Sequence, residues 1–133
     1  MSRENLEVVR HLIEAWNQRD GDLAGTYLDS DVEWAPAGPA AVERTVYRGR
    51  DECARGFAAV WETWDEFHFT ETEVRDLGDS ILWLGHVQMR GKSSHVELDQ
   101  EFAHHVVLFG GKVVRTHAFL SWREAIEAAG LSD

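Results

Sequence analysis

The order of two hydrophobic periods along the chain is the feature that most constrains its fold. Residues 3–18 repeat apolar side chains at helical spacing, for example at Leu6, Val9 and Ile13. From Phe67 onward the pattern changes to the alternation typical of β-strands. An amphipathic helix must bury its apolar stripe, and a sheet with one apolar face offers the matching surface. The sequence therefore predicts an α+β fold, with N-terminal helices packed on the concave face of a bent, mostly antiparallel sheet.

Turn signals divide this pattern into further elements. Asp20-Gly21-Asp22 ends the first helix and can cap a second, shorter helix that carries Leu23, Tyr27 and Leu28. After the first helix pair we expect a strand at 32–34, an irregular segment at 35–47 with both prolines, and a helix at about 50–64. Strands are then predicted from Phe67 to the turn at Leu77-Gly78-Asp79-Ser80, at 81–89, at 96–109 and at 112–120, followed by a short helix at 124–129. The segment 96–109 is long for one strand, so we expect a bend or bulge along it.

Composition excludes several classes of function. The formal net charge of −11 works against binding to nucleic acid or to an anionic membrane, because phosphate groups need a cationic face. Cys53 is the only cysteine, which excludes an intramolecular disulfide and a cysteine-based zinc site. No apolar stretch approaches the roughly 20 residues that span a bilayer, and the N-terminus does not resemble a signal peptide. We therefore expect a cytoplasmic protein without nucleic-acid or membrane partners.

Alternation along the strand at 96–109 identifies a candidate pocket residue. One face carries Phe102, His104, Val106 and Leu108, whereas the other face carries a carboxylate, Glu101. Since the first face has no carboxylate, it is the better candidate for the interior, with His104 inside and His105 outside. A slip of one residue would exchange the two histidines. By the same argument, Thr116, Ala118 and Leu120 share one face of the last strand.

Short phrases of the sequence, in their order, are similar to a known family. The phrases are Glu14-Ala15-Trp16-Asn17 with Asp20, Asp31-Val32-Glu33-Trp34, Tyr47-Arg48-Gly49-Arg50, and Phe109-Gly110-Gly111-Lys112-Val113-Val114. Together they resemble the nuclear transport factor 2-like superfamily, in its SnoaL-like, polyketide cyclase-related branch. The resemblance covers essentially the whole chain and implies a single SnoaL-like domain over 1–133, with a cone-shaped, cystatin-like sheet. It also implies a homodimer through the outer sheet face, which would present His105, Val107, Phe109, His117 and Phe119.

The resemblance also assigns residues to the catalytic positions of relatives. Leu12, Trp34 and His104 (or His105) stand where ketosteroid isomerases have a tyrosine and two aspartates, so that chemistry is disfavoured. His104 matches the histidine that similar polyketide cyclases use, but Ala118 stands where they have an aspartate. Another carboxylate would have to replace it. Glu73 and Arg75 alternate on the first long strand, and one of them could face the pocket.

Two functions remain open from the sequence. One is a cofactor-independent isomerase, cyclase or lyase that acts on a small apolar carbonyl compound, with His104 as the acid–base residue. The other is a non-catalytic module that binds a small hydrophobic ligand in the same pocket. A third interpretation, a domain that acts only through protein contacts, applies if the protein's own side chains fill the pocket. The residues predicted to line the pocket are Trp16, Trp34, Leu12, Thr116 and Ala118. We expect no metal, because His104 and His105 point to opposite faces and no HExxH-type motif occurs.

Overall fold

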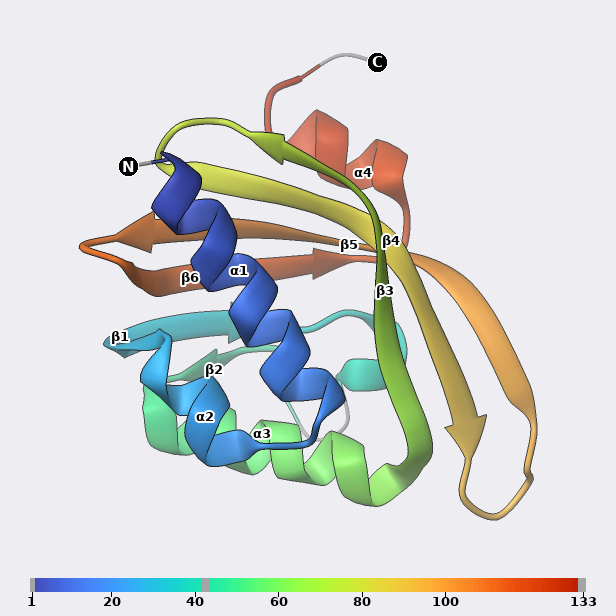
Figure 1. The fold of residues 1–133 in the computed structure, drawn as a ribbon. Coiled ribbons are helices and arrows are strands. Elements are labelled where there is room, and N and C mark those ends of the chain that lie inside the picture. The colour runs from blue at the N-terminus through green and yellow to red at the C-terminus, as the bar shows by residue number, and fades with distance from the viewer. Residues whose placement is uncertain (1, 42–43, 132–133) are drawn as a thin grey trace.

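A six-stranded, strongly bent sheet forms the frame of the protein (Figure 1). The computed structural model describes residues 2–41 and 44–131. Its helices are α1 (Ser2–Asn17), α2 (Gly21–Thr26), the short 3₁₀ helix η1 (Gly38–Ala40), α3 (Arg50–Thr63) and α4 (Trp122–Ala128). Its strands are β1 (Leu28–Ala35), β2 (Tyr47–Arg48), β3 (Trp64–Asp76), β4 (Ser80–Gly91), β5 (Glu97–Phe109) and β6 (Lys112–Phe119). The predicted α+β fold with a bent, unclosed sheet is confirmed.

The strands lie in the order β2-β1-β6-β5-β4-β3. All neighbouring pairs are antiparallel except β1 and β6, which run parallel and pair Trp34 with Thr116. The sequence predicts a bent, mostly antiparallel sheet, and one parallel pair is consistent with that prediction. A parallel pair requires a long connection, and here α3 and the four strands β2 to β5 separate β1 from β6 along the chain.

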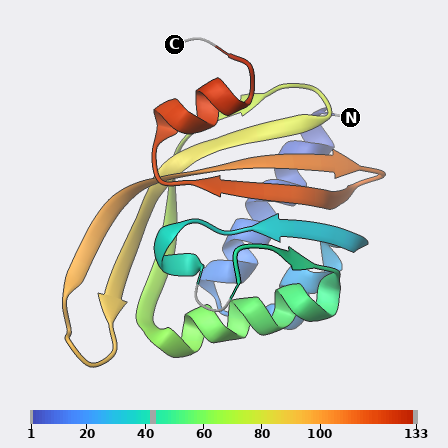
Figure 2. The same ribbon diagram turned by 180° about the vertical axis from the view of Figure 1, so that it is seen from behind.

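Helices cover the two faces of the sheet unequally (Figures 1 and 2). Successive residues of β4 separate the two cores, because strand side chains alternate between faces. Ile81 and Trp83 belong to the large core beneath α1 and α3. Leu82 and Leu84 belong to a smaller core against α4. The N-terminal helices therefore lie on the concave face, as predicted, and α4 covers part of the opposite face.

The C-terminal end of α1 is fixed to β3, the edge strand of the sheet. The Trp16 indole Nε1 donates to the Phe67 carbonyl at 2.9 Å. The Asn17 side chain donates to the Phe69 carbonyl at 2.9 Å and accepts from the Phe69 amide at 2.8 Å. These bonds satisfy backbone groups that an edge strand otherwise leaves unpaired. They also fix the position of Trp16 relative to the sheet.

The sheet bends where β3 carries an extra residue opposite β4. Glu71 pairs with Gly85 and Glu73 with Leu84, which leaves one residue of β3 unpaired as a β-bulge. A Cβ atom at Gly85 would lie 2.1 Å from the Thr70 carbonyl oxygen, so only glycine permits this close approach. The pairing of β5 with β6 also shifts, because Val107 pairs with Arg115 and Leu108 with Val113, and the extra residue, Val114, lies on β6. The strand at 96–109, for which a bend or bulge was predicted, curves along its length (Figure 1).

Several element boundaries differ from the sequence prediction. The second helix was predicted to carry Tyr27 and Leu28, but α2 ends at Thr26 and Leu28 begins β1. The reason is long-range pairing: the Val113 amide of β6 donates to the Tyr27 carbonyl at 2.9 Å. The C-terminal helix begins two residues earlier than predicted because the Ser121 side chain caps it, accepting from the Glu124 amide.

Candidate functional site

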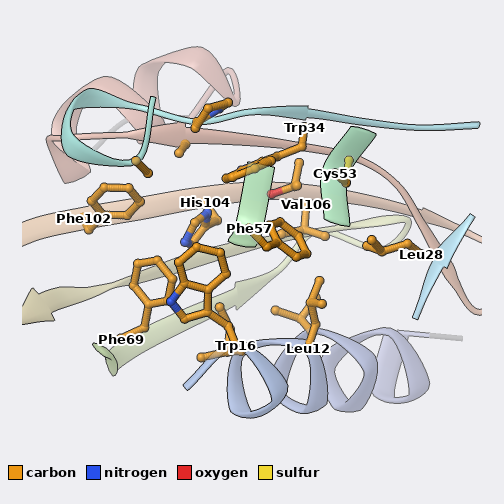
Figure 3. A pocket seen from close by; sticks show the side chains of 16 residues that line it. Leu12, Trp16, Leu28, Trp34, Cys53, Phe57, Phe69, Phe102, His104 and Val106 are labelled. Atoms are coloured by element: carbon orange, nitrogen blue, oxygen red, sulfur yellow. The ribbon is translucent and has the colours of Figure 1, made fainter. Parts of the chain in front are cut away.

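A pocket lies between the concave face of the sheet and the helices α1 and α3 (Figure 3). Its cavity volume is about 50 Å³. Its walls come from α1, β1, α3, β3, β5 and β6, so elements from both ends of the sequence build one site. The lining residues are Val9, Leu12, Ile13, Trp16, Leu28, Trp34, Pro36, Ala40, Cys53, Phe57, Phe69, Phe102, His104, Val106, Thr116 and Ala118.

All six residues that the sequence analysis named as site candidates line this one pocket. They are Leu12, Trp16, Trp34, His104, Thr116 and Ala118. Sheet register explains why four of them meet: Trp34 pairs with Thr116 across β1 and β6, and His104 pairs with Ala118 across β5 and β6. Paired residues project to the same face of a sheet.

His104 is buried among aromatic rings. It is 8% exposed, and its imidazole lies 5.0 Å from the Phe69 ring, 5.1 Å from the Phe102 ring and 5.4 Å from the Trp83 ring, between ring centroids. Its Nε2 atom is buried and has no hydrogen-bond partner in the described part of the chain. Burial lowers the pKa of His104 to about 3, because the charged imidazolium would lose its hydration. At neutral pH the side chain is therefore an uncharged imidazole.

His105 faces away from the pocket. Its Nε2 atom shares a hydrogen bond of 3.2 Å with the Ser80 hydroxyl on β4. Burial, and then the nearby charges of Arg115 and His117, lower its pKa. The orientation in which His104 points inward and His105 outward, which a register slip would have reversed, is the one in the structure.

No carboxylate, lysine, arginine or tyrosine is among the lining residues. Glu73 and Arg75, considered as one inward charge, instead pair with each other at 2.7 Å and do not line the pocket. The Tyr47 ring stacks on Trp34 at 4.9 Å, and its hydroxyl accepts from the Arg44 amide at 3.2 Å. The polar side-chain groups of the described lining are therefore the His104 imidazole, the Thr116 hydroxyl, the Cys53 thiol and the indole nitrogens of Trp16 and Trp34. Burial raises the pKa of the Cys53 thiol to about 12.

The two pocket tryptophans are held in place by their neighbours. The Trp16 ring meets the Trp34 and Phe57 rings edge-on, at 6.2 Å and 5.2 Å, while its indole nitrogen is bonded to β3. The Trp34 ring is fixed between Tyr47 and Phe57. Rigid aromatic walls of this kind suit an apolar or aromatic guest.

Sequence reasoning missed several wall residues. Val9 and Ile13 lie on the same helical stripe as Trp16, so their spacing was a usable signal. Phe67 and Phe69 lie on the same face of β3 and are both buried, but nothing in the local sequence indicates that Phe69 reaches the pocket. Leu28 had been placed in a helix, which hid its position on β1.

The sequence matches a known domain family. A model of the SnoaL-like domain matches residues 9–116, and the protein belongs to this family. Among curated protein sequences, none matches this chain at a significant level.

Solved structures resemble the whole fold. An NTF2-like protein of unknown function from Burkholderia pseudomallei K96243 superimposes with a TM-score of 0.80 at 23% identity, over 93% of this chain and 95% of that one. The structure of TerC co-crystallised with polyporic acid gives 0.79 at 19% identity, over 93% and 98% of the two chains. A putative SnoaL-like polyketide cyclase from Shewanella denitrificans OS-217 gives 0.76 at 12% identity, over 93% and 97%. At these identities the likeness establishes the fold alone.

In residues 2–41 and 44–131, no helix is long and apolar enough to cross a membrane. Within the same ranges, no group of three or more histidine, cysteine, aspartate or glutamate side chains is arranged to hold a metal ion.

Proposed function

We propose that this protein binds a small hydrophobic molecule in the pocket around His104, and that it does so without acid–base catalysis by the protein. The observation that supports this most directly is a largely apolar pocket in which Nε2 of the His104 imidazole has no hydrogen-bond partner among the described residues. Apolar walls with one or two fixed polar atoms are typical of small-molecule sites. TerC, which shares the fold, was crystallised with polyporic acid, and a related structure from Catenulispora acidiphila holds trimethylamine.

The alternative is a cofactor-independent isomerase, cyclase or lyase with His104 as proton shuttle. General acid–base catalysis is efficient when the pKa of the catalytic group lies near the working pH. The pKa of His104, lowered to about 3, makes the imidazole a weak base. A second titratable group would be needed to receive or return the proton, and Ala118 stands at the position where the cyclases have their aspartate. These two features favour binding over catalysis.

The size of the pocket sets a condition on the ligand. A cavity that holds benzene measures about 150 Å³, whereas this pocket has about 50 Å³. A ring-sized guest must therefore displace part of the wall. Leu12 and Ile13 are partly exposed and are not hydrogen-bonded through their side chains, whereas Trp16 is bonded to β3. We expect Leu12 and Ile13 to move and Trp16 to stay.

Toluene provides a direct test of pocket binding. A ligand that binds only the folded state raises the midpoint of thermal unfolding. We expect saturating toluene to raise the midpoint of the wild type. Ala118→Phe, which fills the pocket from β6, should abolish that increase. Ala58→Phe is the matched control, because it makes the same substitution at an exposed position of α3 that does not line the pocket. An equal response of all three proteins, or no response of the wild type, would contradict the proposal.

A homodimer through the outer face of β5 and β6 is part of the same proposal. Phe109 is 80% exposed at the hairpin end of β5, and farther along the neighbouring strand β6 the His117 and Phe119 rings stack in parallel at 4.6 Å. Apolar and aromatic side chains grouped on one face favour a symmetric partner. Analytical ultracentrifugation should find a dimer for the wild type and a monomer for Val107→Glu. Ser94→Glu, in the distant turn between β4 and β5, should remain dimeric. A monomeric wild type would refute this assembly.

A further inference from the structure

The pocket carries no charge at neutral pH. Among the residues that the structure describes, the lining includes no aspartate, glutamate, lysine or arginine. Its two titratable lining groups are also neutral there, because burial lowers the pKa of His104 to about 3 and raises the pKa of Cys53 to about 12. An ionised ligand would have to leave its hydration shell and would meet no opposite charge inside. The lining therefore disfavours the binding of both anions and cations.

One buried nitrogen of the described lining makes no hydrogen bond. The Nε2 atom of His104 is buried and has no partner in the described part of the chain, although the ring itself packs against the Phe69 and Phe102 rings (Figure 3). A buried polar atom without a partner raises the free energy of the empty pocket. A ligand that supplies the missing bond regains that energy, and the fixed ring loses little freedom when the bond forms.

The chemistry of imidazole narrows the group that can supply this bond. In a neutral imidazole, one nitrogen is a donor and the other an acceptor. One tautomer therefore places a donor at Nε2, and the other tautomer places an acceptor there. A hydroxyl group serves both cases, because it donates one hydrogen and accepts through its oxygen. A carbonyl or ether oxygen serves only one tautomer.

We infer that the pocket selects neutral molecules with a single hydroxyl group on a compact apolar body, and that this hydroxyl binds Nε2 of His104. The inference rests on the proposed binding function and specifies its ligand class. It combines the uncharged lining, the unpartnered nitrogen and the small volume of one cavity. Phenol is the simplest aromatic member of this class.

Three probes of similar size test the inference. Phenol carries the hydroxyl, toluene replaces it with a methyl group, and benzoate adds a negative charge. Dissociation constants are measured at pH 7 by ligand-detected NMR for the wild type, His104→Leu and His68→Leu. His68 is exposed on β3 and is absent from the pocket, so it is the matched histidine replacement. We expect the ratio of phenol affinity to toluene affinity to fall about tenfold in His104→Leu, as the loss of one hydrogen bond implies, and to stay unchanged in His68→Leu.

The wild type alone supplies a second measurement, which does not depend on how the variants fold. Benzoate should bind at least a hundredfold more weakly than phenol, since its charge has no partner in the pocket. Benzoate binding comparable to that of phenol would overturn the inference, as would an unchanged phenol-to-toluene ratio in folded His104→Leu. Toluene binding without a preference for phenol refutes the hydroxyl specificity but leaves the proposed function intact. Failure of both neutral probes to bind refutes the proposed function and the inference together.

Discussion

The buried imidazole of His104 should make the stability of the protein depend on pH in a way that one substitution removes. In the folded state the pKa of His104 is about 3, whereas an exposed histidine in the unfolded chain has a pKa of about 6.5. Between these two values the unfolded chain binds a proton that the folded chain does not bind. Stability is therefore full above pH 6.5 and is lost progressively as the pH falls towards 3.

The size of the effect follows from the two pKa values. At pH 5 the proton bound by the unfolded chain lowers the free energy of unfolding by about 2 kcal/mol, from linkage at one site. At pH 7 the same term is close to zero. Acidic groups with a lowered pKa, such as Asp99 beside Gln88 and His86, also contribute stability that the protein loses in acid. They are present in every variant compared below, so they cancel in the difference.

Urea denaturation at pH 7 and pH 5 measures this difference. His104→Leu replaces the imidazole with an apolar side chain and leaves no buried nitrogen, so at pH 7 it should fold at least as well as the wild type. Between pH 7 and pH 5 it should lose about 2 kcal/mol less stability than the wild type or the His68→Leu control. An equal loss in the wild type and His104→Leu would refute the burial argument, because it would mean that the imidazole is protonated as readily in the folded protein as in the unfolded chain.

Further predictions concern packing, anchoring and thiol reactivity. Gly85→Ala should cost about 3 kcal/mol or more in urea denaturation, since the new methyl group meets the Thr70 carbonyl; Gly25→Ala, with open space around it, should cost nothing. Asn17→Ala should cost about 2 kcal/mol because two bonds to the backbone of β3 are lost, whereas Gln18→Ala at the neighbouring exposed position should be near neutral; equal values for the pair would contradict the anchoring of α1. Burial raises the pKa of the Cys53 thiol to about 12, so Ellman's reagent should modify it only in denaturant. Rapid labelling of the native protein would contradict the burial of this thiol.

Local patterns in the sequence were sufficient for most of the elements. The helical stripe through Leu6, Val9 and Ile13 predicted α1, and alternation on β5 separated His104 from His105 correctly. The helix depends on the hydrophobicity of residues three or four apart, and the strand on that of residues two apart. Both spacings can be read directly from the sequence. Boundaries were less predictable where distant pairing decided them, as at Leu28. The cytoplasmic location and the absence of nucleic-acid partners stay predictions from composition.

The sequence by itself determined that an amphipathic helix would cover an alternating sheet, and which face of β5 would carry His104. Only the tertiary structure decided what surrounds that histidine. The parallel pairing of β1 with β6 brings Trp34 beside Thr116, and the bulge opposite Gly85 bends β3 and β4. The pocket volume and the unpartnered Nε2 depend on distances between atoms that are far apart in the chain. Periodicity is a local property of the sequence, whereas a cavity and a missing hydrogen bond exist only once several elements have packed together.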